Sequence, residues 1–199
     1  MDKLLLERLQ KRMAGTAVGP ATARGMGPAG TIQASRAFLA SLDLASVRSK
    51  VEWRFRRNLD AATEELQRSL PRGAQHWGSA RKFLNIFLRN CLYSRYMAHE
   101  YQLDVLEPWL ELPLDSHVAK GLRKEEGGRV ALPRWKTVVG LDRSTSDQYQ
   151  QFASQVAAGM NMHRVHLDVV YWRGDHMQKQ AAPRLAVRNR RARASDLAR

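Results

Sequence analysis

Two short segments decide the fold: residues 82–89, KFLNIFLR, and residues 112–118, LPLDSHV. The first has the apolar spacing of an amphipathic helix, which we expect to run from about Ala80 to His99. In the second, aspartate follows proline by two positions, and this order marks the start of another helix. We therefore expect one helix at each of these two segments. Our hypothesis is that the fold brings Lys82 and Asp115 together in one site.

The rest of the chain also shows mainly helical signals, so we predict an all-α fold. Residues 1–178 would form a single, mostly helical domain, and the Arg-rich residues 179–199 a basic, disordered tail. Two segments, 129–141 and 163–173, combine signals for strand and helix. Further helices are expected at residues 2–13, at 31–42, at 47–70 and at 144–159, with a short helix or turn at 103–110.

A glycine-rich loop is expected at residues 14–30. Its segment 25–30, GMGPAG, matches the dinucleotide-binding pattern G-x-G-x-x-G as a string. No apolar strand precedes it, and the chain lacks alternating strands and helices, so a nucleotide-binding Rossmann site is excluded. A surface loop is the preferred interpretation, and a contact with a DNA backbone is the alternative.

The net charge of +14, from 33 Lys and Arg against 19 Asp and Glu, predicts a polyanionic partner. Nucleic acid is the first choice. No apolar run approaches the roughly 20 residues that span a bilayer, and no secretory signal is recognisable, so we expect a cytoplasmic protein without a membrane partner. The lone Cys91 excludes an internal disulfide and an all-cysteine metal cluster.

Lys82 and Asp115 are the candidate catalytic residues. A lysine near Trp77 and Phe83 would be partly desolvated, and desolvation favours the neutral, nucleophilic amine. Asp115 would be a carboxylate that stabilises positive charge developing on a sugar. The simpler alternatives are a solvated or phosphate-binding lysine and a plain helix cap.

Asp168 and Trp172 are candidates for substrate binding, together with Trp77. Four residues separate Asp168 from Trp172, so both lie on one helical face, where a ring and a carboxylate suit an extruded nucleobase. The alternative is a core tryptophan beside a surface aspartate. His163, His166 and Asp168 lack a fourth ligand with supporting spacing, so we predict no metal site and no cofactor.

Together these segments resemble the helix-hairpin-helix DNA glycosylases. The resemblance is carried by Lys82 at the start of a helical run and by residues 112–118, which are similar to the stretch that holds the family's catalytic aspartate. The late segment 166–172, HLDVVYW, is similar to the archaeal 8-oxoguanine DNA glycosylase (AGOG) branch. The resemblance implies a helical fold with the site between two helical layers. It also implies that Lys82 attacks the sugar C1′, that Asp115 assists, and that Asp168 and Trp172 recognise the flipped base. Residues 71–78 depart from the family's compact hairpin, and the single Cys91 rules out the iron–sulfur cluster of the endonuclease III branch.

The resulting hypothesis is a monomeric base-excision DNA repair enzyme, a DNA glycosylase with AP-lyase activity acting on double-stranded DNA. Which base it removes, and whether it serves housekeeping repair or defence against foreign DNA, stays open. The alternatives are a non-enzymatic, basic helical nucleic-acid-binding protein and a basic partner in a larger assembly. Phosphate contacts are expected from exposed arginines: Arg54, Arg57, Arg72 and Arg81.

Overall fold

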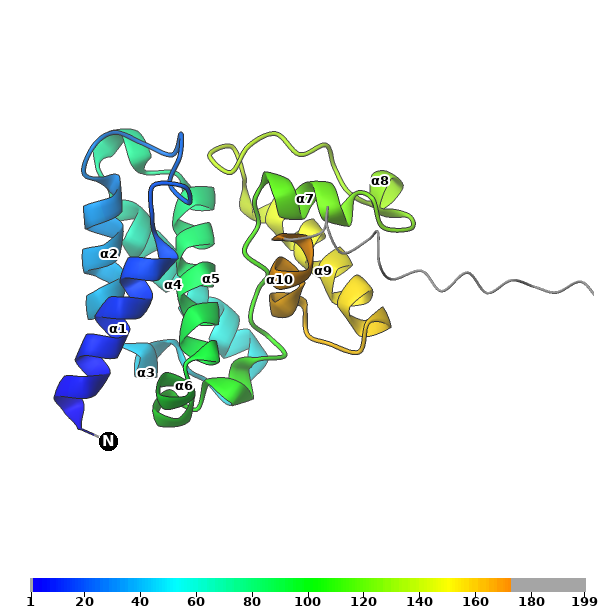
Figure 1. The fold of residues 1–199 in the computed structure, drawn as a ribbon. Coiled ribbons are helices and arrows are strands. Elements are labelled where there is room, and N and C mark those ends of the chain that lie inside the picture. Colours follow the sequence, from blue (N-terminus) through cyan, green and yellow to red (C-terminus); the bar gives the residue numbers. More distant parts are fainter. Residues whose placement is uncertain (1, 173–199) are drawn as a thin grey trace, which may run out of the picture.

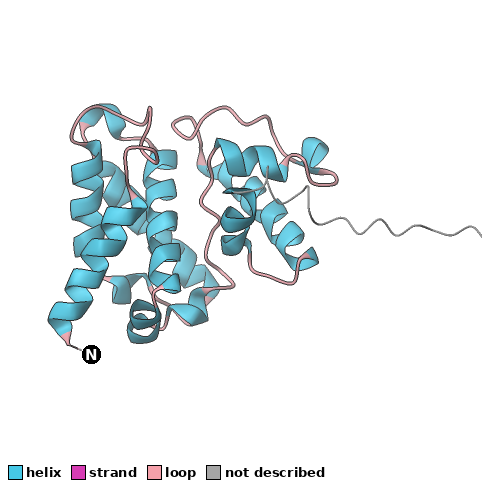
Figure 2. Ribbon diagram, in the orientation of Figure 1, coloured by secondary structure: helices cyan, strands magenta, loops and turns pink. Residues whose placement is uncertain are grey.

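The computed structural model of the chain describes residues 2–172. Within this range it contains ten α-helices and no strand, so the predicted all-α class is confirmed (Figure 2). Three single turns of 3-10 helix, η1 (Arg72–Ala74), η2 (Leu103–Leu106) and η3 (Arg164–His166), complete the regular structure. The α-helices are α1 (Lys3–Ala17), α2 (Thr31–Ser41), α3 (Leu44–Val47), α4 (Glu52–Ser69), α5 (Trp77–Tyr93), α6 (Arg95–Tyr101), α7 (Ser116–Leu122), α8 (Gly128–Ala131), α9 (Arg143–Gly159) and α10 (Leu167–Trp172).

The helices gather into two lobes (Figure 1). One contains α1 to α6 and the other α7 to α10, and an extended connector at residues 110–115 runs between them. Each lobe has its own apolar cluster, with Phe55, Phe83 and Phe87 fully buried in the first and Leu112 and Tyr149 in the second.

Helix α5 is the central element of the first lobe. It packs on α1 and α4, and eleven of its residues are buried, polar ones among them. A Cβ atom at Gly78 would lie 2.1 Å from the carbonyl oxygen of Val138 and 2.7 Å from the Cβ of Leu141. Because only glycine permits this approach, Gly78 lets the loop before α9 lie against the start of α5.

Several predicted helix boundaries were wrong. The first helix ends at Ala17 instead of residue 13, because Ala14 and Ala17 are fully buried and the helix continues along the core. The glycine-rich loop is correspondingly shorter than residues 14–30. The predicted helix 47–70 is interrupted at residues 48–51, where the buried Ser49 accepts a hydrogen bond from the backbone N–H of Val51.

The predicted helix 80–99 is likewise two helices, α5 and α6, which meet at Ser94. Of the two ambiguous segments, 129–141 forms α8 and then irregular loop, whereas 163–172 forms η3 and α10. The predicted tail 179–199 and the domain boundary at residue 178 lie outside the described residues. No helix between residues 2 and 172 is long and apolar enough to cross a bilayer.

Candidate active site

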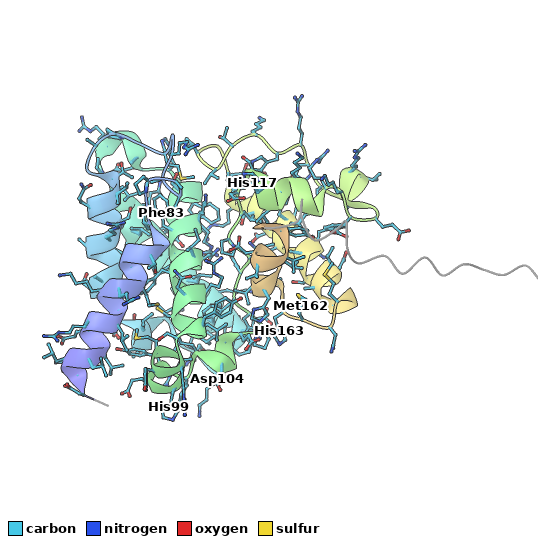
Figure 3. All side chains as sticks on the ribbon, viewed as in Figure 1. Phe83, His99, Asp104, His117, Met162 and His163 are labelled. Carbon is cyan, nitrogen blue, oxygen red and sulfur yellow. The ribbon has the colours of Figure 1, made fainter. Side chains whose placement is uncertain are left out.

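A cavity of about 700 Å³ lies where the two lobes meet. The end of α1 contributes Thr16, and the loop after it contributes residues 21–22 and 24–26. Helix α5 contributes one face with Lys82, Ile86 and Arg89. The second lobe supplies the start of α7 at residues 115–117, together with residues 137–139 and Asp168 of α10. Figure 3 shows His117 at the start of α7, on the side that faces the first lobe.

Lys82 lies in the wall of this cavity with 7% of its surface exposed. Its Nζ is 3.5 Å from the Oδ2 of Asp115 and 3.5 Å from the carbonyl oxygen of Thr22, to which it donates a hydrogen bond. Burial lowers the pKa of Lys82, and the neighbouring Asp115 carboxylate only partly opposes this shift. At a given pH, the neutral fraction of Lys82 is therefore larger than that of a solvated lysine.

Asp115 has two roles, one for each carboxylate oxygen. Its Oδ1 accepts hydrogen bonds from the backbone N–H groups of His117 (2.9 Å) and Val118 (3.0 Å), so it is the N-cap of α7. Its Oδ2 is the atom that faces Lys82. The cap holds the carboxylate in one orientation, and the predicted juxtaposition of Lys82 and Asp115 is present in the structure.

Asp168 also lines the cavity, but it forms an ion pair with Arg89 of α5. Burial lowers the pKa of Arg89, and its Nε has no hydrogen-bond partner among residues 2–172. Sequence reasoning did not find Arg89. Its position seven residues after Lys82, hence on the same helical face, was the available signal.

The two predicted aromatic contacts have different outcomes. Trp77 does not line the cavity, contrary to expectation, because its ring packs into the apolar cluster of the second lobe. The guanidinium groups of Arg81 and Arg143 lie 5.3 and 5.9 Å from that ring's centroid. Trp172 belongs to α10 by its backbone, but its side chain lies outside the described part of the structure.

Three of the four predicted phosphate-binding arginines, Arg54, Arg57 and Arg72, are exposed, and their role stays a prediction. The fourth prediction was wrong. Arg81 is 5% exposed, and its guanidinium donates to both carboxylate oxygens of Glu111, at 2.8 Å each. A third donor of Arg81 reaches the hydroxyl of Thr63 at 2.8 Å. Arg81 cannot reach a DNA backbone because its hydrogen-bonding groups are used inside the protein.

Replacing Arg81 with alanine is expected to destabilise the fold strongly. Although burial opposes the charge on Glu111, Arg81 holds the pKa of Glu111 below its ordinary value, so that carboxylate is ionised and would be left unpaired. Breaking a buried ion pair from one side costs about 3–5 kcal/mol in the free energy of unfolding. Urea unfolding of Arg81→Ala measures this cost. The control is Arg143→Ala. Arg143 is an exposed arginine whose pairs with the half-buried Asp60 and the exposed Glu64 should be worth no more than about 1 kcal/mol. Equal losses in both variants would contradict the account.

Comparisons with protein-family models, with curated proteins and with solved structures found no match for this chain. Among the residues that the structure describes, no group of three or more His, Cys, Asp or Glu side chains is arranged to hold a metal ion. What the cavity contains is a buried amine, a capped carboxylate and a second acid paired with an arginine.

Proposed function

We propose that this protein is a DNA N-glycosylase with AP-lyase activity. The observation that carries the proposal is the buried Lys82, whose Nζ lies 3.5 Å from the Oδ2 of Asp115 in the wall of a cavity. A buried amine with a lowered pKa is a nucleophile, and an oriented carboxylate stabilises an oxocarbenium-like charge. The net charge of +14 suits a DNA substrate.

In the proposed reaction the neutral Nζ of Lys82 attacks the sugar C1′. The bond from C1′ to the base breaks, and its electron pair leaves with the base, which takes up a proton. The nitrogen of Lys82 loses a proton, for which the Asp115 carboxylate is the nearest acceptor. The sugar ring then opens as O4′ leaves C1′ and is protonated, which gives an imine. Removal of a C2′ proton and departure of the 3′ phosphate complete the β-elimination and cut the strand.

Base recognition is assigned to Arg89 and Asp168, which line the same cavity. Arg89 and Asp168 offer a donor group beside an acceptor group, which is the pattern that reads the hydrogen-bonding edge of a flipped base. The cavity volume of about 700 Å³ is within the range of sites that enclose a small organic group. Oxidised, mismatched and deliberately modified bases all remain candidate substrates.

A second candidate function is that of a non-enzymatic nucleic-acid-binding protein. The observation that favours it is Trp53, 58% exposed at the start of α4. The guanidinium groups of Arg54 and Arg57 lie 5.3 and 5.7 Å from its ring centroid. An exposed ring beside cationic groups can stack on a base and contact phosphates. This candidate leaves the burial of Lys82 against Asp115 unexplained.

A panel of duplexes, each with one oxidised, mismatched or modified base, distinguishes the two functions. The glycosylase proposal expects release of the base and strand scission with at least one member. It also expects a covalent DNA–protein adduct on borohydride treatment, because the hydride reduces the imine to a stable secondary amine. Binding without base release, nicking or adduct across the panel would favour the non-enzymatic alternative.

The lowered pKa of Lys82 predicts a particular pH dependence. The neutral fraction of an amine rises with pH and is half-maximal at the pKa, which burial places below the ordinary lysine value. Borohydride trapping of the wild-type protein on DNA with a preformed abasic site should therefore persist to a lower pH than expected for a solvated lysine. A trapping midpoint at the ordinary lysine pKa would contradict the assignment of Lys82 as the desolvated nucleophile.

A further inference from the structure

The connector between the lobes is extended and buried. Leu110, Glu111, Leu112 and Leu114 are at most 3% exposed, and residues 110–115 belong to no helix. No strand runs beside them in the described range, so the connector has no ladder partner for its backbone polar groups. Buried backbone groups need hydrogen-bond partners, and here side chains from the lobes supply them.

Gln150 of α9 provides the partner at Leu112. Its side-chain Nε2 donates to the Leu112 carbonyl oxygen at 2.8 Å, and its Oε1 accepts from the Leu112 N–H at 2.9 Å. One amide therefore satisfies both backbone groups of one residue, as a neighbouring strand would. Arg164 of η3 satisfies only carbonyl groups of the preceding residues, because its guanidinium donates to the carbonyl oxygens of Trp109 (2.6 Å) and Leu110 (3.0 Å).

The side chain of Glu111 links the connector to α5 by hydrogen bonds. Its carboxylate receives the two hydrogen bonds of Arg81, at 2.8 Å each, and a third from the Nδ2 of Asn85 at 3.0 Å. A bidentate pair of this kind fixes direction as well as distance. The attachment therefore sets the connector in one register along α5.

The same two segments carry the proposed catalytic pair. Arg81 immediately precedes Lys82 on α5, and Glu111 lies four residues before Asp115 in the connector. Pro113 stands between Glu111 and Asp115 and restricts the backbone of the intervening stretch. A shift of Glu111 relative to Arg81 would thus be transmitted to Asp115. The cap of α7 orients the Asp115 carboxylate within the second lobe, but it does not hold that lobe at the right distance from Lys82.

We propose that the Arg81–Glu111 pair and Gln150 act as positioning residues, which set the Asp115 carboxylate against Lys82 for the reaction. The inference rests on the proposed function. Neither the Arg81–Glu111 pair nor Gln150 lines the cavity, so both would act through Asp115. Arg81 of α5 and Gln150 of α9 approach the connector from opposite lobes, and together they fix both of its sides.

Two variants test the proposal separately, Glu111→Gln and Gln150→Ala. The first readout is the pH dependence of borohydride trapping on DNA with a preformed abasic site. Because Asp115 opposes the effect of burial on Lys82, its displacement should move the trapping midpoint to lower pH. The other charged or titratable groups lining the cavity are unchanged in both variants: Arg24, Arg89, His117 and Asp168. The second readout is the excision rate per folded protein. We expect it to fall about 10- to 100-fold, because a displacement of the Asp115 carboxylate by about 1 Å has an effect of this size.

The matched control is Thr63→Val. The Thr63 hydroxyl accepts a hydrogen bond from the same Arg81 guanidinium and donates its own to the carbonyl oxygen of Leu59, so neither bond involves the connector. Its loss should lower the melting temperature and leave both the trapping midpoint and excision per folded protein unchanged. If Glu111→Gln behaves like this control, with an unmoved midpoint and no loss of excision beyond the loss of folded protein, the positioning role is wrong.

A double variant shows whether the effect passes through Asp115. In an Asp115→Asn background, Glu111→Gln should not shift the trapping midpoint further, since the carboxylate that it positions is already gone. An additional shift of the same size would overturn the proposal. Failure of the proposed function looks different, because the wild-type protein would then neither excise a base nor form an adduct.

Discussion

Lys82→Gln should abolish base excision and borohydride trapping together. Glutamine retains a polar side chain of similar length but has no nucleophilic nitrogen, so no imine can form. Loss of a covalent nucleophile reduces turnover on the order of 10³-fold or more. Single-turnover excision on the best duplex of the panel measures the loss. DNA binding should persist, because the phosphate contacts are assigned to exposed arginines elsewhere.

The matched control for this variant is Lys120→Gln. Lys120 is an exposed lysine on α7, the helix that Asp115 caps, and its replacement removes the same charge. It should leave excision and trapping at the wild-type level. Lys82→Gln is also expected to fold normally, because it removes a charge that burial disfavours. Excision that survives in a folded Lys82→Gln protein would assign the chemistry to another residue.

Asp115→Asn should reduce excision by about 10²- to 10³-fold, the usual consequence of losing one oriented electrostatic group in an active site. Asparagine is as good an N-cap as aspartate, and its amide oxygen can still accept from the N–H groups of His117 and Val118. The variant therefore removes the charge opposite Lys82 while keeping the start of α7. The excision rate measures the catalytic role of Asp115, and the melting temperature measures its role as the cap of α7. The DNA affinity shows whether substrate binding is kept.

Asp142→Asn is the matched control for the cap. Asp142 is the N-cap of α9, where its Oδ1 accepts from the Thr145 N–H at 2.7 Å, and it does not line the cavity. This variant should change neither excision nor trapping. If Asp115→Asn excises as fast as the wild-type protein, Asp115 is only a helix cap and the catalytic pair has to be abandoned.

The segments that carry Lys82 and Asp115 were predictable because each has a local signal, whereas their meeting in one site was a hypothesis that the family resemblance implied. Lys82 begins a run with strong apolar spacing inside the helix that starts at Trp77, and Asp115 follows a proline at a helix start. The all-α class followed from the same periodicity. The break at Ser94 was missed because an amphipathic pattern continues across two successive helices without revealing the bend between them.

The buried polar contacts could not be predicted. Arg81 and Lys82 are adjacent cations in the sequence, and nothing local indicates that Arg81 is neutralised by an acid 30 positions away. The partner of Asp168 is even more remote in the sequence, since Arg89 belongs to the other lobe. The position of Trp77 depends on the guanidinium groups and the loop that surround it. These features arise from the packing of lobes, which a pattern along one chain does not encode.

The most direct test of the account is to locate the borohydride-stabilised adduct. The wild-type protein is trapped on DNA with an abasic site, digested with protease and nuclease, and the modified peptide is identified by mass spectrometry. We expect the sugar remnant on the Nζ of Lys82. A remnant on any other amine of the chain would contradict the central claim that the lysine buried against Asp115 is the nucleophile.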